Sequence, residues 1–464
     1  MSENRLLILL NPGKQSRHYM LGLARSAARL QIPHACLEMH DLWAMRDAEA
    51  ASRGVMAACV RVQFELSRLV RKHRITHVLG YAWNGALDFG LLSREPGEGG
   101  EPVFAALGVR HVMLWTDHPD WFSQGAALRP EFARRLDHPL HTHILKSRAA
   151  AEEVAGVLGW RNTMAMPMAE GPDRFTTDSG REHSPVHDVV AIMGGVAALS
   201  PEVAPFLDHD HPDPREMDLA VLPAAMTRWR RWVAAQGLAE DEADPVARAG
   251  EQLLKGKLAQ PTRSYWSLSE GLSAGVAGGA IGWLKDDPQR WYGAVAVLRR
   301  LGDWRRSFYP AWLARRLDLG LYGCCGAPAG IRQTRSSPGW VEYEDQAAVY
   351  RRGRVALNIN AAHDEEGLSH KPFQIASSGV ACVHHRSSGL EQCFEPGREV
   401  TTFGQADELL DAIRQLVSNP ARAREMGKAM QERAMREHTW DQRLVRMLEA
   451  AGSSATEPAV AMAA

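Results

Sequence analysis

Residues 350–385, YRRGRVALNINAAHDEEGLSHKPFQIASSGVACVHH, contain the pattern that decides the fold. Val355–Asn360 and Val380–His384 are predicted as strands because each is a short apolar run bounded by turn residues. Between them, Pro372 suits the first position of a helix and Gly379 suits the left-handed residue that ends one. The stretch therefore predicts a strand–helix–strand unit.

The same alternation occurs along most of the chain. Arg5–Leu10 (RLLILL) is a continuous apolar run, as expected of a parallel strand buried on both faces. Asp188–Met193 (DVVAIM) starts a second series, which includes a predicted strand at Trp340–Tyr343. Repeated strand–helix units imply parallel, doubly wound sheets, so the predicted class is α/β with two such domains. The Trp-, Ala- and Arg-rich stretch 199–303 departs from this rhythm and is predicted as a helical insertion.

These patterns set the expected domain boundaries. We expect a Rossmann-like domain over residues 1–172, a turn-rich linker over 173–186, a second domain over 187–440 that carries the insertion, and a terminal helix with a frayed tail over 441–464.

Composition excludes several classes of protein. The 464 residues include 54 Lys and Arg against 55 Asp and Glu, a net charge of −1, which argues against a strongly basic nucleic-acid binder. No apolar run reaches the roughly 18 residues of a membrane span, and the first residues lack the basic region of a signal peptide. The six cysteines show no CxxC spacing. We therefore expect a cytoplasmic protein with no nucleic acid as partner.

Lys371 is the first indication of a binding site. It lies at a helix entrance, where a cation opposes the helix dipole unless an anion binds there. Gln374 follows three residues later on nearly the same face, and Glu366 precedes it by eight positions. A carboxylate before the helix (Glu366) and an amide in its first turn (Gln374) suit hydrogen bonds to a sugar hydroxyl and to a ribose diol. The alternative is an ordinary helix entrance with solvated acids and a solvated lysine.

Residues 350–385 and their continuation SSGLEQCFEPGREVTTFGQADELLDAIRQLVSNP (387–420) resemble the C-terminal domain of group-1, hexosyltransferase-like glycosyltransferases of the GT-B fold. The nearest branch is the CgeB-like spore-maturation proteins. Weaker similarities at Thr116–Pro119 and Asp188–Gly195 extend to both domains, but not to the insertion. The resemblance implies two Rossmann-like domains facing across a cleft, a nucleotide-diphosphate sugar as substrate, an acceptor on the N-terminal side, and no metal or cofactor.

Carried over by position, the family's Glu-x7-Glu pattern falls on Glu366, followed by Gly367, and on Gln374. The resemblance implies that Glu366 contacts the donor sugar and that residue 374 contacts the ribose, although glutamine replaces the usual glutamate. Lys371 takes the place of a residue that is usually arginine and would neutralise the diphosphate.

Other candidates follow predicted strands. The glycine turns at Gly13 and at Gly194-Gly195 suit diphosphate binding, and His384 could line the donor pocket; plain strand–helix turns are the alternative for each glycine. Asp117 and His118 are candidates for the general base that an inverting transferase needs, against a capping aspartate and a hydrogen-bonded histidine in an ordinary turn.

The leading hypothesis is a metal-independent glycosyltransferase that moves a sugar from a nucleotide-diphosphate donor to an unknown acceptor. The rival is a non-catalytic, degenerate GT-B module that binds nucleotide, glycan or a protein partner. Gln374 and the insertion favour the rival.

Overall fold

A computed structural model of the chain describes residues 4–86, 91–92, 101–121, 123–175, 185–194, 199–272, 275–323 and 340–453. The chain divides into two compact units, one of Met1–Met166 with Thr439–Ala464 and the other of Pro167–His438. Among the described residues, none of the helices combines the length and the apolar character that crossing a membrane requires.

The first unit is built on a six-stranded sheet of order β2-β1-β3-β6-β7-β8 in which all neighbouring strands pair in parallel. Its strands are β1 (Leu6–Leu10), β2 (His34–Glu38), β3 (His77–Tyr81), β6 (Arg110–Trp115), β7 (His141–Leu145) and β8 (Thr163–Ala165). β4 (Leu91–Leu92) and β5 (Glu101–Pro102) form a separate antiparallel pair. Every residue of β1 is buried, as its continuous apolar run predicts for a strand covered on both faces.

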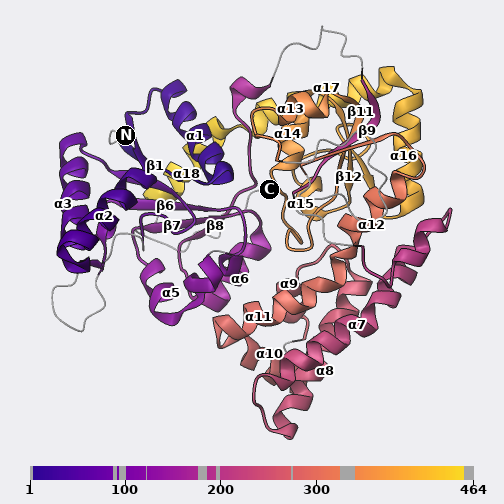
Figure 1. The fold of residues 1–464 in the computed structure, drawn as a ribbon, viewed down its shortest axis with the longest axis horizontal. Helices are drawn as coiled ribbons and strands as arrows, with labels where there is room; N and C mark the ends of the chain where they lie inside the picture. Colours follow the sequence, from indigo (N-terminus) through magenta and orange to yellow (C-terminus); the bar gives the residue numbers. More distant parts are fainter. Residues whose placement is uncertain are drawn as a thin grey trace. The chain divides into compact units, whose positions relative to one another are not determined.

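Helices connect these strands: α1 (Lys14–Arg29), α2 (Met39–Arg53), α3 (Val55–His73), α4 (Val103–Ala106), α5 (Pro130–Leu136) and α6 (Arg148–Leu158). The last helix of the chain, α18 (Trp440–Ser453), packs beside α1 in the same unit (Figure 1). Trp440 explains this packing, because its ring lies 5.9 Å from that of Tyr19 and fills the space above Gly22.

The second unit contains a five-stranded parallel sheet of order β10-β9-β11-β12-β13. The strands are β9 (His187–Ile192), β10 (Leu319–Tyr322), β11 (Gly353–Asn358), β12 (Ala381–His385) and β13 (Thr401–Phe403). The helices that follow the insertion are α12 (Trp304–Leu313), α13 (Gln346–Tyr350), α14 (Lys371–Ser378), α15 (Ser388–Glu391), α16 (Ala406–Ser418) and α17 (Pro420–Glu437). The predicted α/β class with two parallel-sheet domains is confirmed.

Between β9 and β10 lie the helices α7 (Pro214–Ala234), α8 (Glu240–Ala259), α9 (Tyr265–Glu270), α10 (Gly275–Lys285) and α11 (Pro288–Arg299), which group together beside the sheet of the second unit (Figure 1). Their aromatic residues form a core of their own. Trp229 is fully buried, stacks on Trp232 at 5.0 Å and donates a hydrogen bond to the carbonyl of Ala247. This segment supplies one wall of the cavity described below.

The predicted strand at Trp340–Tyr343 is wrong, because these residues form coil and turn. The carbonyl of Tyr343 accepts a hydrogen bond from Nη2 of Arg174 at 3.1 Å instead of joining a ladder. The Trp340 and Tyr343 rings also lie 5.7 Å apart, so the aromatic pattern arises from a local cluster and not from strand alternation.

Substitution of Gly427 by alanine is expected to destabilise the second unit by about 2–3 kcal/mol. A Cβ there would lie 2.1 Å from the carbonyl oxygen of Gly379, where α17 crosses the end of α14. Urea unfolding measures the change. Gly282→Ala in α10 is the control, because apart from the backbone of its own helix no atom of the described residues lies within 4 Å of its added Cβ, and it should be neutral or slightly stabilising. Equal stability of the two variants would contradict the tight crossing.

Candidate functional site

The carboxyl ends of β9 and β11 mark the place in the second unit where a ligand is most easily bound. From β9 the chain goes on to β10 on one side of the sheet, and from β11 it goes on to β12 on the other side. Open parallel sheets bind ligands at such a switch point, outside the carboxyl ends of the strands. Gly194 follows β9, and the loop after β11 leads into α14.

Lys371 is the first residue of α14, and its side chain is half-buried. Its Nζ donates to Oε1 of Gln346 at 2.7 Å and lies 5.8 Å from the ring centre of Tyr343. Among the described residues no carboxylate forms an ion pair with it. Burial lowers the pKa of Lys371 to about 7, and the charge of Arg306 adds to this effect. An ammonium group in this position is stabilised when an anion binds beside it.

Arg306 is a second cation at this edge, and sequence reasoning did not identify it. It lies in α12, and its Nη2 donates to the carbonyl oxygen of Gly194 at 3.2 Å. Arg306 is 65 residues from Lys371 in sequence, so their proximity depends on how α12 packs. In the sequence, the one feature that marks Arg306 is its place in the basic and aromatic run Trp304–Phe308 (WRRSF). Two cations thus lie near enough for the charge of one to affect the other, and one of them is bonded to Gly194.

Gln374 is one turn along α14 from Lys371 and is 1% exposed. Neither its Oε1 nor its Nε2 has a hydrogen-bond partner in the described part of the chain. Leaving a buried amide unsatisfied costs about 1–3 kcal/mol per group, so such groups in native proteins call for an explanation. Hydroxyl groups of a ligand would satisfy both atoms.

The carboxylate of Glu366 is engaged with the insertion. Its Oε1 accepts hydrogen bonds from the backbone nitrogen of Ser264 at 2.8 Å and from Oγ of Ser264 at 3.0 Å. Ser264 is the residue that caps α9, so Glu366 reinforces the start of that helix. The adjacent Glu365 accepts from the nitrogen of Tyr265 at 3.4 Å.

Two further predicted residues of this unit contribute mainly to its packing. Gly367 lies against Gly389, where a Cβ would be 2.8 Å from the Gly367 carbonyl. His384, in β12, is fully buried and its Nε2 lies 2.8 Å from Nδ2 of Asn358. Burial lowers the pKa of His384 to about 4, so the ring is neutral and its Nε2 accepts this hydrogen bond. Gly195 lies outside the described residues.

Gly13, Asp117 and His118 belong to the first unit. Gly13 precedes α1, and its carbonyl accepts from Oγ of Ser16 at 2.9 Å. Nδ1 of the buried His118 lies 3.4 Å from Oε2 of Glu153 on α6, and Oδ2 of Asp117 accepts from Oγ1 of Thr116 at 3.3 Å. At this distance the carboxylate of Glu153 is close enough to interact with the imidazole of His118.

Comparison with known proteins finds one family model that matches the C-terminal part of the chain. Residues 305–449 match the family described as "Glycosyl transferase-like". This match contains Arg306, Glu366, Lys371 and Gln374, but not the insertion helices α7–α11. No curated protein matches the chain.

Among solved structures, Anabaena HepE in complex with UDP is 13% identical, with 96% of this chain and 100% of that chain covered and a TM-score of 0.41. A glycosyltransferase from Rickettsia africae is 6% identical over 98% of this chain and 99% of that one, with a TM-score of 0.43. A sucrose-phosphate synthase from Thermosynechococcus elongatus is 14% identical over 84% and 77%, with a TM-score of 0.37. Scores at this level indicate a distant likeness.

Proposed function

We propose that this chain is a glycosyltransferase of the group-1, CgeB-like type that moves a sugar from a nucleotide-diphosphate donor to an acceptor without a metal ion. The observation that carries the proposal is the buried amide of Gln374, which has no partner among the described residues and lies one turn from the cation Lys371. The match of residues 305–449 to a glycosyl transferase-like family supports assigning both groups to the binding of a sugar nucleotide.

The chemistry assigns a role to each group. Glycosyl transfer passes through an oxocarbenium-like state while negative charge grows on the departing diphosphate. Lys371 and Arg306 stabilise that charge, because both cations are already held in place by the fold, Lys371 at the start of α14 and Arg306 by its bond to Gly194. Gln374 hydrogen-bonds the ribose hydroxyls. Glu366 contacts the sugar, and Asp117 or His118 accepts the proton of the acceptor hydroxyl.

A non-catalytic binding module is the second candidate, and Glu366 is the observation that favours it. One of its carboxylate oxygens already accepts two hydrogen bonds from Ser264. In this alternative the acid holds the insertion in place, and the nucleotide is bound without reaction.

Binding and turnover distinguish the two candidates. Thermal unfolding is measured with UDP, GDP and ADP, followed by hydrolysis assays with the sugar nucleotide of whichever base stabilises the protein. Stabilisation with hydrolysis supports the transferase, and stabilisation without hydrolysis or transfer to any glycan supports the binding module. Absence of stabilisation by all three nucleotides would contradict the transferase and a nucleotide-binding module, and would leave only a module that binds glycan or a protein partner.

Substitution of Gln374 by methionine is expected to weaken binding of the stabilising nucleotide roughly 10-fold, since it removes hydrogen bonds to the ribose. The same change should stabilise the ligand-free protein by about 1 kcal/mol, because an apolar side chain of similar size replaces an unsatisfied amide. Isothermal titration and urea unfolding measure the two effects. Gln415→Met, at an exposed position of α16, is the control and should change neither. Loss of stability in Gln374→Met without loss of affinity would show that the amide serves the fold.

A further inference from the structure

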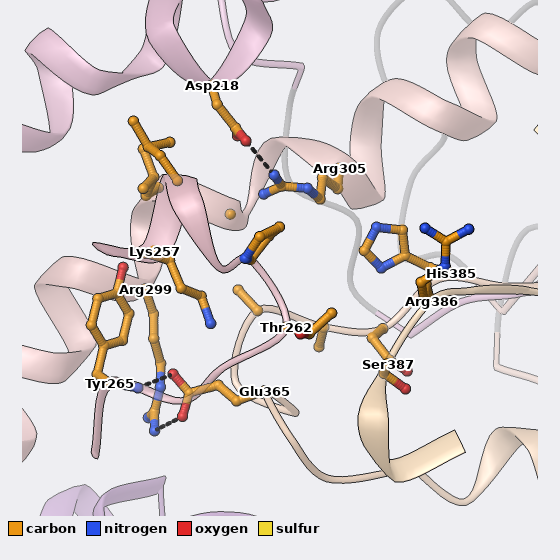
Figure 2. Close-up of a pocket in the computed structure, with 17 residues that line it drawn as sticks. Asp218, Lys257, Thr262, Tyr265, Arg299, Arg305, Glu365, His385, Arg386 and Ser387 are labelled. Atoms are coloured by element: carbon orange, nitrogen blue, oxygen red, sulfur yellow. Dashed lines mark hydrogen bonds and ion pairs between the residues drawn. The ribbon is translucent and has the colours of Figure 1, made fainter. Parts of the chain in front are cut away.

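A cavity of about 60 Å³ lies where the insertion meets the sheet of the second unit. Its walls come from α7, α8, α9, α11 and α12 on one side and from the loops after β11 and β12 on the other (Figure 2). Lys371, Gln374 and Gly194 do not line it, although the loop after β11, which borders the switch point, supplies Asn360 and Glu365 to its lining. Several of its lining groups lie outside residues 305–449, the part that matches a known family.

Cations outnumber acids among the lining residues. The cations are Lys257, Arg299, Arg305 and Arg386, and the acids are Asp218 and Glu365. The four basic residues come from α8, α11, α12 and the loop after β12, so the fold brings them together from distant parts of the sequence (Figure 2).

Each arginine has a carboxylate partner. Arg305 pairs with Asp218 at 2.6 Å and Arg299 with Glu365 at 3.4 Å. Arg386 pairs with Glu408, outside the cavity, at 3.4 Å, and both of these side chains are about half exposed, so this pair adds little. The guanidinium of Arg386 can therefore turn toward a ligand at small cost.

Lys257 has no such partner. Its Nζ donates to the backbone carbonyl of Arg263 and lies 5.3 Å from the ring centre of Tyr265, and it forms no ion pair in the described ranges. Burial lowers the pKa of Lys257, and the charges of Arg305 and Arg299 lower it further, while Glu365 opposes them. An anion in the cavity would offset this repulsion.

Neutral hydrogen-bonding groups complete the lining. Thr262 and Ser387 place hydroxyl groups beside the cations (Figure 2). Burial and the charge of Arg305 lower the pKa of His385 to about 3, so its imidazole is neutral and can donate a hydrogen bond. Cations from several directions together with hydroxyl donors suit a tetrahedral oxyanion.

We propose that this cavity binds a phosphate group, either inorganic phosphate or the phosphomonoester of a sugar phosphate, at a site separate from the nucleotide-diphosphate site. Lys257, Arg305 and Arg386 contact the phosphate oxygens, and Thr262 and Ser387 hydrogen-bond to them. The volume admits a group of several water-sized atoms, which fits a phosphate.

The test measures binding of inorganic phosphate and of glucose 6-phosphate by titration calorimetry at constant ionic strength, with chloride as the reference anion. Lys257→Gln and Arg386→Gln should each weaken binding about 10-fold or more, because each removes a charge-assisted contact. Both positions are partly exposed, so the variants are expected to fold, and thermal unfolding without ligand checks this. Arg300→Gln is the matched control, since Arg300 follows Arg299 but is 66% exposed and outside the lining.

Phosphate binding that is lost in the two cavity variants and kept in Arg300→Gln supports the site. Tighter binding of glucose 6-phosphate than of phosphate identifies a phosphomonoester ligand, and equal or weaker binding identifies the free ion. Absence of binding to the wild type, or equal binding by all variants, overturns the proposal. Equal loss of nucleoside diphosphate affinity in the cavity variants would overturn it too, since the cavity would then belong to the donor site. Failure of Lys371→Met to affect nucleotide binding would instead count against the proposed function.

Discussion

Lowering the pH from 7.5 to 5 is expected to destabilise the first unit by on the order of 5 kcal/mol, because several of its histidines are buried in the neutral form. Burial lowers the pKa of His141 to about 4 and that of His143 to about 3. Burial also holds the pKa of His111 well below its usual value, and the neighbouring histidines lower it further.

The sign follows from proton uptake. An unfolded histidine takes up a proton near pH 6.5, whereas these folded side chains remain neutral until the pH is much lower. The unfolded state therefore binds more protons between about pH 6.5 and 4, and stability falls as the pH is lowered through that window. His141 and His143 each contribute about 2 kcal/mol at pH 5, a large share of the 5–15 kcal/mol that stabilises a typical domain.

The contacts of His143 show why protonation cannot be accommodated. Its Nδ1 accepts a hydrogen bond from Nε1 of Trp115 at 3.1 Å, its Nε2 lies 3.0 Å from the carbonyl of Leu136, and its ring stacks on Trp160 at 4.0 Å. A protonated ring has no acceptor nitrogen, so the bond from Trp115 would be lost.

Urea unfolding followed by tryptophan fluorescence at pH 5, 6 and 7.5 measures this effect, since Trp115 and Trp160 report on the first unit. His141→Gln should reduce the pH dependence by about 1.4 kcal/mol per pH unit, the value of one proton. His40→Gln, at an exposed position of α2, should leave it unchanged. Equal stability at pH 5 and 7.5 in the wild type would contradict the assignment of neutral buried histidines.

The strands of both sheets could be predicted because their physical signal is local. Leu6–Leu10 is apolar throughout, and every one of its side chains is buried. The left-handed Gly379, with φ of 71°, ends α14 as its position after the helical run predicts. Trp340–Tyr343 was predicted wrongly because aromatic residues favour strands and also local ring clusters, and sequence alone does not separate the two.

The contacts of the candidate site could not be predicted, since they join residues far apart in sequence. Glu366 was assigned to the donor sugar, and its bonds to Ser264, 102 residues earlier, depend on how the insertion packs on the loop after β11. Arg306 was missed for the same reason. By contrast, the proximity of Lys371 and Gln374 follows from helical spacing, which a sequence does encode.

Substitution of Lys371 by methionine is expected to weaken nucleoside diphosphate binding about 100-fold and to abolish measurable transfer, the largest effect on function that the site predicts. Loss of the ammonium removes the charge at the entrance of α14 on which the growing negative charge depends. The control is Lys428→Met on α17, whose lysine is 74% exposed and pairs with Glu432. Unchanged affinity in Lys371→Met would contradict the assigned role.

The pH dependence separates a charge effect from a packing effect at this position. Because burial lowers the pKa of Lys371 to about 7, the ligand-free ammonium is mostly protonated at pH 6.5 and mostly neutral at pH 8.5. Nucleotide affinity should therefore fall roughly 20-fold over that interval in the wild type. Lys371→Arg should bind with little dependence on pH, because a guanidinium stays charged throughout.

Stability of the ligand-free protein should change in the opposite direction. An unfolded lysine holds its proton up to about pH 10.5, whereas Lys371 releases it near a pKa of 7, so the unfolded state binds more protons between those values. Stability should thus rise with pH from 7 to 10 in the wild type and stay flatter in Lys371→Met, as urea unfolding can measure. The wild-type protein should therefore bind nucleotide most tightly near pH 6.5, where Lys371 lowers its stability. This result would show that Lys371 is kept for its ligand, since an apolar residue would stabilise the fold more.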